Sequence, residues 1–228
     1  ALGAIGILWV VLWALFYKTR EVVVAEKSVS TSSWQEIAHT KSFWFLMLVY
    51  YCYASGVFFF ISWLPKYLHQ GRGIPQDELT YSASLPFILA AIGCLVGGSL
   101  SDFLVNKMGI VWGRRVVQLA GLSLSGFAML FATYTHDLSI TIIMLALGLA
   151  FMDVTAPVAW AVATGLGKNH AGAITGAMNT AGLLGGTVTS LGIGYLVTSS
   201  GDYDLPVAII GVQLIVGALL TLGIKAES

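Results

Sequence analysis

The sequence predicts an all-α, polytopic membrane protein built as a bundle of transmembrane helices. Hydrophobic residues make up 57% of the 228 positions, charged residues only 10%, and the mean hydropathy is +0.84. A soluble domain carries about 25% charged residues, so this chain cannot cover an ordinary water-exposed surface. Its apolar residues also fall into runs of about membrane length, because a hydrocarbon core about 30 Å thick needs roughly 20 helical residues.

Seven apolar runs qualify as spans or nearly do. The first starts at Ala1 without the basic start or small-residue cleavage site of a signal peptide, so we expect it to be a partial helix of a preceding bundle. The last six are expected to form a complete six-helix bundle over residues 43–228. The runs are 1–17, 43–68, 80–104, 115–134, 139–164, 171–198 and 205–224.

Residues 18–42 form the longest polar connection and are the expected boundary between two bundles. Within them, Ser33-Trp34-Gln35-Glu36 has the spacing of a helix-capping box. This fits either a short helix lying on the membrane surface or a plain linker with one helical turn.

Basic residues predict the orientation, because cytoplasmic loops carry an excess of Lys and Arg. Only Lys66 and Arg72 are basic residues of one side, which also carries the acidic Asp137, Asp202 and Asp204. We therefore expect a multi-pass protein of the cell inner membrane with a cytoplasmic linker and a cytoplasmic C-terminus. The basic residues of the opposite, cytoplasmic side are Lys18, Arg20, Lys27, Lys41, Lys107, Arg114, Arg115, Lys168 and Lys225.

Several function classes are not supported by the sequence. The formal net charge of zero argues against a nucleic-acid footprint. We find no nucleophile elbow, phosphate-binding loop, paired-carboxylate site or dinucleotide fingerprint, and the four histidines show no metal-binding spacing. The prediction is a protein that is not an enzyme and that uses no cofactor or metal.

Asp153 is the one ionisable residue well inside a predicted span. A carboxylate there costs roughly 2.5–3.5 kcal/mol on insertion scales, so it should face a protein interior or a wet cavity. It is either a structural carboxylate bonded to a neighbouring helix or a group that handles protons or substrate.

Four further residues are candidates for lining a substrate cavity. Tyr50 and Tyr53 share one helix face at a spacing of three residues. Trp160 offers an indole N–H beside a flat apolar face, and the Asn179 amide can bond a carboxylate or hydroxyl. Together Trp160 and Asn179 would suit a small polyhydroxylated acid, although helix packing and core filling are the alternative roles for both.

A charged hinge joins the spans 80–104 and 115–134. The glycine pair Gly97-Gly98 is suited to close helix packing, and Asp102 follows at the end of the span. Arg114 and Arg115 stand just before the next span, within expected ion-pair reach of Asp102 in at least one conformational state.

Three groups of residues carry a family resemblance. The first is Ile61–Leu68 with Gly71-Arg72-Gly73 and Ser84–Phe87, the second is Gly97–Asp102 with Arg114-Arg115, and the third is Asp153–Trp160 with Lys168–Gly172 and Gly176–Gly186. They resemble the anion:cation symporter family, the organic-anion branch of the major facilitator superfamily, over nearly the whole chain from residue 43 onward. The resemblance implies twelve helices in two bundles, of which this chain would be the C-terminal half.

The resemblance also implies a function and some of its residues. Members of the family carry sugar acids and other small carboxylates with protons, or with sodium in some animal members. Trp160 and Asn179 match positions that line the substrate cavity in relatives, and Asp102, Arg114 and Arg115 match the gating-loop signature. The main anion-binding arginine and the proton-carrying carboxylates would belong to the other bundle.

We therefore expect a fragment of a proton-coupled symporter for a small organic anion, such as hexuronate, galactonate or glucarate, working by alternating access. Its partners would be that anion, protons, the lipid bilayer and the N-terminal bundle. One alternative is an exporter or exchanger of a related carboxylate on the same fold. Another is a membrane scaffold or sensor that does not transport, in which Asp153, Trp160 and Asn179 would have no reason to share a cavity face.

Overall fold

The fold is described from a computed structural model that covers residues 2–16, 37–167 and 170–225. The chain divides into two compact units, Ala1–Thr31 and Ser32–Ser228. The first unit contributes one described helix, α1 (Leu2–Phe16), within the predicted run 1–17. Most of the predicted linker 18–42, including the capping box at Ser33, lies outside the described residues.

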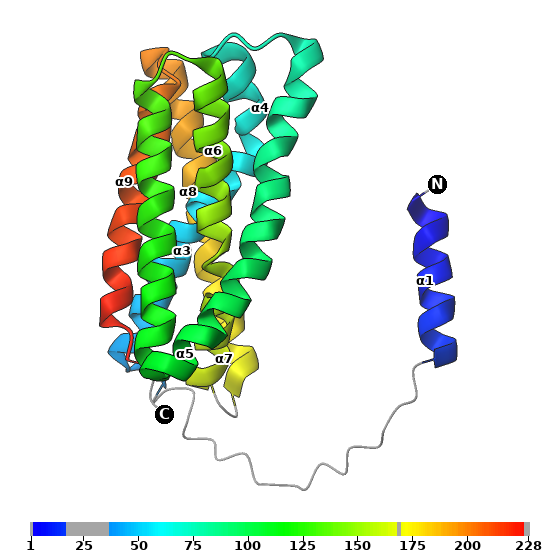
Figure 1. Cartoon of the computed structure of the whole chain (residues 1–228), viewed down its shortest axis with the longest axis vertical. Helices are drawn as coiled ribbons and strands as arrows, with labels where there is room; N and C mark the ends of the chain where they lie inside the picture. Colours follow the sequence, from blue (N-terminus) through cyan, green and yellow to red (C-terminus); the bar gives the residue numbers. More distant parts are fainter. Residues whose placement is uncertain (1, 17–36, 168–169, 226–228) are drawn as a thin grey trace, which may run out of the picture. The chain divides into compact units, whose positions relative to one another are not determined.

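The described residues of the second unit are helical apart from short connections, which confirms the all-α prediction (Figure 1). By length and composition, five described helices can cross a membrane. The elements are α3 (Lys41–Ser62), α4 (Leu64–Lys66), η1 (Tyr67–Gly71), α5 (Gln76–Tyr134), α6 (Leu138–Asp153), α7 (Ala156–Gly167), α8 (Ala171–Ser200), α9 (Asp204–Leu220) and η3 (Thr221–Gly223).

The helix α5 differs from the prediction of two spans joined by a loop at 105–114. It is a single stretch of 59 residues whose one non-helical residue is Gly109, with φ 80° and ψ 164°. At 1.5 Å per residue it would be about 88 Å long if straight, roughly three times the hydrocarbon core. Because glycine tolerates a positive φ, the chain reverses at Gly109, and Figure 1 shows two antiparallel limbs. The expected loop is thus helical on both sides of one glycine.

Two prolines explain where the other long spans are interrupted. Proline has no N–H and its ring clashes with the carbonyl four residues earlier. Pro65 follows the end of α3 at Ser62, so the predicted span 43–68 continues as the short α4 and η1. Pro157 divides the predicted span 139–164 into α6 and α7, with Val154 and Thr155 between them.

Close backbone contacts place the first limb of α5 against the end of α6. A Cβ at Gly93 would overlap the carbonyl of Ala150, and one at Gly97 would overlap the carbonyl of Val154. The predicted close-packing pair is therefore right for Gly97 and wrong for Gly98, since no described atom lies within 4 Å of a Cβ built at Gly98. The reason is helical geometry: a neighbour four residues away shares the packing face, and the adjacent residue does not.

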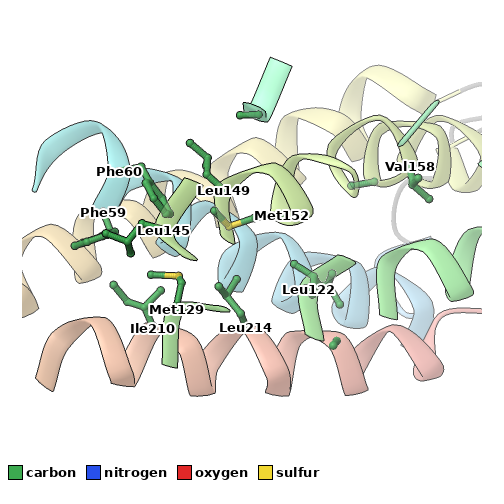
Figure 2. Close-up of a cluster of buried hydrophobic side chains, with 14 of the residues drawn as sticks. Phe59, Phe60, Leu122, Met129, Leu145, Leu149, Met152, Val158, Ile210 and Leu214 are labelled. Atoms are coloured by element: carbon green, nitrogen blue, oxygen red, sulfur yellow. The ribbon is translucent and has the colours of Figure 1, made fainter. Parts of the chain in front are cut away.

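The apolar core lies between α3, the second limb of α5, α6 and α9 (Figure 2). Met152 is fully buried at its centre and contacts Gly56 on α3. In lipid, such helices associate through van der Waals contact and close approach instead of through exclusion of water. The core therefore fixes the end of α6, where Asp153 follows Met152. The fully buried side chains of this region include Phe59, Phe60, Leu122, Met129, Leu145, Leu149 and Leu214.

Candidate functional site

The candidate site is built around the break between α6 and α7. Because Pro157 has no N–H, the main-chain carbonyl of Asp153 lacks its usual helical partner. The chain compensates locally: the N–H of Thr155 and its hydroxyl both donate to the carbonyl of Met152, at 3.0 and 2.7 Å. The break places a carboxylate at the end of a half-helix inside a membrane-crossing segment.

The structure gives Asp153 one specific side-chain partner. The Tyr53 hydroxyl on α3 donates to Asp153 Oδ1 at 2.7 Å, and both side chains are half-buried. The sequence proposed both residues as site candidates and did not pair them. The bond joins α3 to the last residue of α6.

Tyr50 and Trp160 extend the same group. The rings of Tyr50 and Tyr53 lie 5.3 Å apart, and the Tyr50 hydroxyl interacts electrostatically with both the Trp160 side chain and Asp153. Trp160 comes from α7 and is 41% exposed in this bundle. Four predicted residues from three elements therefore lie together.

Asn179 has a less direct relation to this group. Its side chain is exposed on α8, one turn before Gly182, and the Tyr50 ring lies 2.8 Å from a Cβ built at Gly182. The glycine lets α8 approach α3 at the level of Tyr50. The structure thus places Asn179 near the edge of the site, where its amide forms no hydrogen bond with the other four side chains.

Cys94 borders the site from the first limb of α5. It lies between Gly93 and Gly97, which pack against Ala150 and Val154 on either side of Asp153. Its thiol is exposed and lies within electrostatic range of Tyr53. Of the two cysteines, Cys52 is buried and Cys94 is not.

The predicted gating residues do not pair with one another in this conformation. Arg114 donates to the carbonyl of Ala161 on α7 at 3.1 Å, and Arg115 donates twice to the carbonyl of Ile224, at 2.9 and 2.6 Å. Asp102 is exposed and forms no ion pair within the described part of the chain. Arg114 thus contacts a main-chain carbonyl in the middle of α7, and Arg115 contacts the carbonyl that follows η3, where helical partners are lacking.

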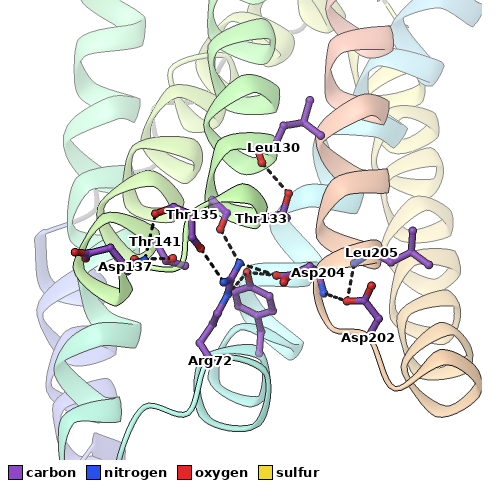
Figure 3. Close-up of polar contacts among 11 residues, drawn as sticks. Arg72, Leu130, Thr133, Thr135, Asp137, Thr141, Asp202, Asp204 and Leu205 are labelled. Carbon is purple, nitrogen blue, oxygen red and sulfur yellow. Dashed lines mark hydrogen bonds and ion pairs between the residues drawn. The ribbon is translucent and has the colours of Figure 1, made fainter.

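A second polar cluster, at the other end of the bundle, was not predicted (Figure 3). Arg72 is 9% exposed and forms an ion pair with Asp204 at 2.7 Å. It also donates to the carbonyls of Ala132 at 2.7 Å and Thr135 at 2.9 Å, which end the second limb of α5. One side chain therefore links η1, α5 and α9.

Tyr67 completes this Arg72 cluster. Its hydroxyl accepts from Arg72 Nε at 2.9 Å and donates to Asp204 at 2.8 Å. Tyr67 lies beyond the end of α3, and burial raises the pKa of its phenol above the ordinary value. The signal in the sequence was a single arginine on a side whose one other basic residue is Lys66.

The described residues contain no group of three or more His, Cys, Asp or Glu side chains able to hold a metal ion. Their Lys and Arg residues all lie near the ends of the passes, so no positive charge accompanies Asp153. The site on this bundle consists of one carboxylate, two phenols, an indole and a nearby amide. It can exchange a proton and can donate neutral hydrogen bonds to a polar ligand.

Comparison with known proteins gives a consistent picture. Residues 1–190 match the family model of the Major Facilitator Superfamily. A probable sulfoacetate transporter of Cupriavidus necator is 30% identical, over 98% of this chain and 56% of the relative. A hexuronate transporter of Bacillus subtilis is 29% identical, over 88% and 50%, and a D-galactonate transporter of Escherichia coli is 29% identical, over 95% and 56%. The chain spans about half the length of these relatives.

Proposed function

The chain belongs to the major facilitator superfamily, and on that premise we propose that it forms one half of a secondary active transporter for a small organic anion. The substrate class is a sugar acid, such as hexuronate, galactonate or glucarate, or another small carboxylate. The anion binds near the bilayer midplane between this bundle and a second one, and transport proceeds by alternating access. Proton symport drives it.

The observation that carries this proposal is the Tyr53–Asp153 pair at a break in a membrane-crossing helix. Discontinuous helices with free carbonyls and an ionisable group are typical of coupling and substrate sites in transporters. Tyr50 and Trp160 lie beside the pair. A scaffold would have no reason to gather these side chains, so the arrangement supports transport over the scaffold or sensor alternative.

Recognition of the substrate divides between the two bundles. In this bundle Trp160, Tyr50 and Asn179 supply hydrogen bonds to hydroxyl and carboxyl oxygens, and the indole face packs against the carbon chain. The positive charge that pairs with the anion comes from the other bundle, because the described basic residues lie near the ends of the helices. The names of the relatives from Bacillus subtilis and Escherichia coli support a sugar acid as the substrate.

Asp153 contributes to proton coupling, beside the carboxylates that the family resemblance places in the other bundle, because it repels the anion. Two negative charges about 7 Å apart repel each other by about 2 kcal/mol at an effective dielectric constant of about 20. Protonation of Asp153 removes this repulsion and favours anion binding by roughly 30-fold. Proton and anion therefore bind together, which is the thermodynamic requirement for symport.

Gating involves the charged residues on the two sides of Gly109, where the limbs of α5 meet. We propose that Asp102 pairs with Arg114 or Arg115 in another conformational state and biases the equilibrium toward it. Asp102→Asn is then expected to change the rate of transport while leaving anion affinity within about twofold. An unchanged transport rate in this variant would count against a gating role.

The proposed orientation places Arg115 and the C-terminus in the cytoplasm and the Arg72 cluster on the outer face of the inner membrane. It rests on the distribution of basic residues. Access of a membrane-impermeant amine reagent to Lys66 from the outside, but not to Lys225, checks this orientation.

Uptake of labelled anions into proteoliposomes tests the function. The full-length transporter should accumulate at least one of hexuronate, galactonate, glucarate or sulfoacetate when the outside is acidic. Accumulation that requires the opposite pH gradient would favour the exporter or exchanger alternative. Absence of uptake and of binding for the whole panel, with folded protein, would contradict an organic-anion transporter.

Two substitutions test the cavity. Asn179→Ala should weaken binding by about 1–3 kcal/mol, because a buried polar group of the substrate loses its partner. Trp160→Phe keeps a flat apolar face and loses the N–H, so its effect should be smaller than that of Trp160→Ala. If neither change at Trp160 affects binding, Trp160 does not belong to the site.

A further inference from the structure

We propose that Tyr53 couples the protonation state of Asp153 to the position of α7, the half-helix that carries Trp160. In this role Tyr53 is a positioning residue and not a substrate contact. The inference rests on the proposed function, because it assigns a part of the coupling mechanism to one hydroxyl group.

The first step is that the Tyr53 hydroxyl is already engaged. It donates to Asp153 Oδ1 at 2.7 Å, from a half-buried ring that also packs against Tyr50. A phenol has a single O–H to donate. A substrate that took this donor would leave a half-buried carboxylate without its partner, so Tyr50, Trp160 and Asn179 are better placed to meet the ligand.

The second step is that the Tyr53–Asp153 bond ends beside the proline-induced break between α6 and α7. Backbone contact with Gly93 and Gly97 holds Ala150, which precedes Asp153, and Val154, which follows it. After Val154 the hydrogen-bond pattern tightens, since the N–H of Thr155 donates three residues back, to Met152, before α7 begins at Ala156. Helices change direction where a proline removes a main-chain hydrogen bond, so α7 can move relative to a fixed α6.

The third step is that the strength of the bond depends on the proton. A hydrogen bond to an ionised carboxylate is roughly twice as strong as one between neutral groups. Protonation of Asp153 therefore loosens the link between α3 and the break. Since Trp160 lies on α7 and interacts with Tyr50, the change at Asp153 reaches the proposed substrate contact.

The titratable groups around this pair are few. Within the described part of the chain, Tyr50 from α3 and Cys94 from α5 lie in electrostatic range of Tyr53. The other residues that face the break do not titrate. They are Thr155 at the break itself, Trp160 on α7 and Gly121 on the second limb of α5. Asp153 is therefore the carboxyl group of this cluster, and we assign the proton-dependent change to it.

Tyr53→Phe in the full-length transporter tests the inference, with Tyr51→Phe as the matched control on the same helix. Two activities are compared in proteoliposomes: accumulation of the anion driven by a pH gradient, and exchange of labelled for unlabelled anion at equal pH. We expect Tyr53→Phe to reduce accumulation about tenfold and to leave exchange within about twofold. Tyr51→Phe should leave both within twofold.

The comparison with Asp153→Asn sharpens the result. If Tyr53 acts through Asp153, the double variant should be no worse than Asp153→Asn alone, because residues in one network are not additive. Equal loss of exchange and accumulation, with a raised KM for the anion, would show that Tyr53 is a substrate contact and would overturn the inference. Unchanged activities in Tyr53→Phe would also overturn it.

A second measurement keeps the test valid if Tyr53→Phe folds poorly. Cys94 is exposed beside the site and Cys52 is buried, so a small maleimide reports on the break in the unsubstituted protein. At each pH, the alkylation rate of Cys94 in the unsubstituted protein is divided by its rate in the Asp153→Asn variant. Because the thiol itself responds to pH in both proteins, the ratio cancels that response. The ratio should change at least threefold between pH 5 and 8; a flat ratio would contradict the inference. Failure of the proposed function is distinct, because then the unsubstituted transporter itself would move no anion.

Discussion

Replacing Arg72 by Met should destabilise the bundle more than any other single change at a charged residue described here. The substitution removes the ion pair with Asp204 and three further hydrogen bonds, to Tyr67, Ala132 and Thr135. Breaking a fully buried ion pair costs about 3–5 kcal/mol. The Asp204 side chain is 39% exposed, so water compensates part of that loss. We expect about 2–4 kcal/mol.

Arg72→Lys separates charge from geometry. An ammonium keeps the positive charge but lacks the planar fork that reaches two carbonyls, a phenol and a carboxylate at once. This variant should lose about half as much stability as Arg72→Met. Lys66→Met is the control, since Lys66 stands at the same end of the bundle and its described contact is with the Trp63 ring.

Thermal unfolding of the purified protein in one detergent provides the assay. With about 2–4 °C per kcal/mol for a domain of this size, Arg72→Met should lower Tm by about 5–15 °C and Lys66→Met by less than 2 °C. Arg72→Met combined with Asp204→Asn should be less than additive. A Tm within 2 °C of the unsubstituted protein for Arg72→Met, or no difference for Arg72→Lys, would refute the reasoning.

Three further predictions concern stability and packing. Ser55→Ala should cost about 1–2 kcal/mol of stability, because the Ser55 hydroxyl accepts a hydrogen bond from a glutamine on α9. Ser125→Ala should be nearly neutral, because its buried hydroxyl has no partner in the described structure. Thermal melts of the two variants check this difference. Gly97→Ala should lower the yield of folded protein, because a Cβ would overlap a main-chain carbonyl of the break, while Gly98→Ala should not; size-exclusion profiles compare them. Burial raises the pKa of Tyr67 above its unfolded value of about 10. The stability that this phenol contributes is therefore present below pH 10 and is lost as the pH rises above 10. The fall in Tm between pH 9 and 11 should be smaller in Tyr67→Phe than in the unsubstituted protein.

Helix content and the approximate spans could be predicted because hydropathy and length act locally. Breaks inside the spans were harder. Pro65 and Pro157 are visible in the sequence, but a membrane helix can absorb a proline by local adjustment, so its consequence depends on neighbours. Polar residues and a glycine are typical of loops and of helical hinges alike, so the hinge around Gly109 was wrongly predicted as a loop.

The site was predictable as a set of residues and not as a geometry. Asp153 stood out by its charge and Tyr53 by its place on one helix face, but their 2.7 Å bond joins residues that are 100 positions apart. The Arg72 cluster was missed for a similar reason. Its partners on α5 are main-chain carbonyls, which leave no trace in a sequence pattern.

Anion-driven proton movement tests the central claim most directly. Full-length transporter is reconstituted in proteoliposomes with a pH-sensitive dye inside, the pH equal on both sides, and the anion added outside. We expect internal acidification on addition of the anion, with the Asp153→Asn variant still exchanging anion but moving fewer protons. Anion uptake without acidification in the unsubstituted transporter, or undiminished acidification in Asp153→Asn, would contradict it.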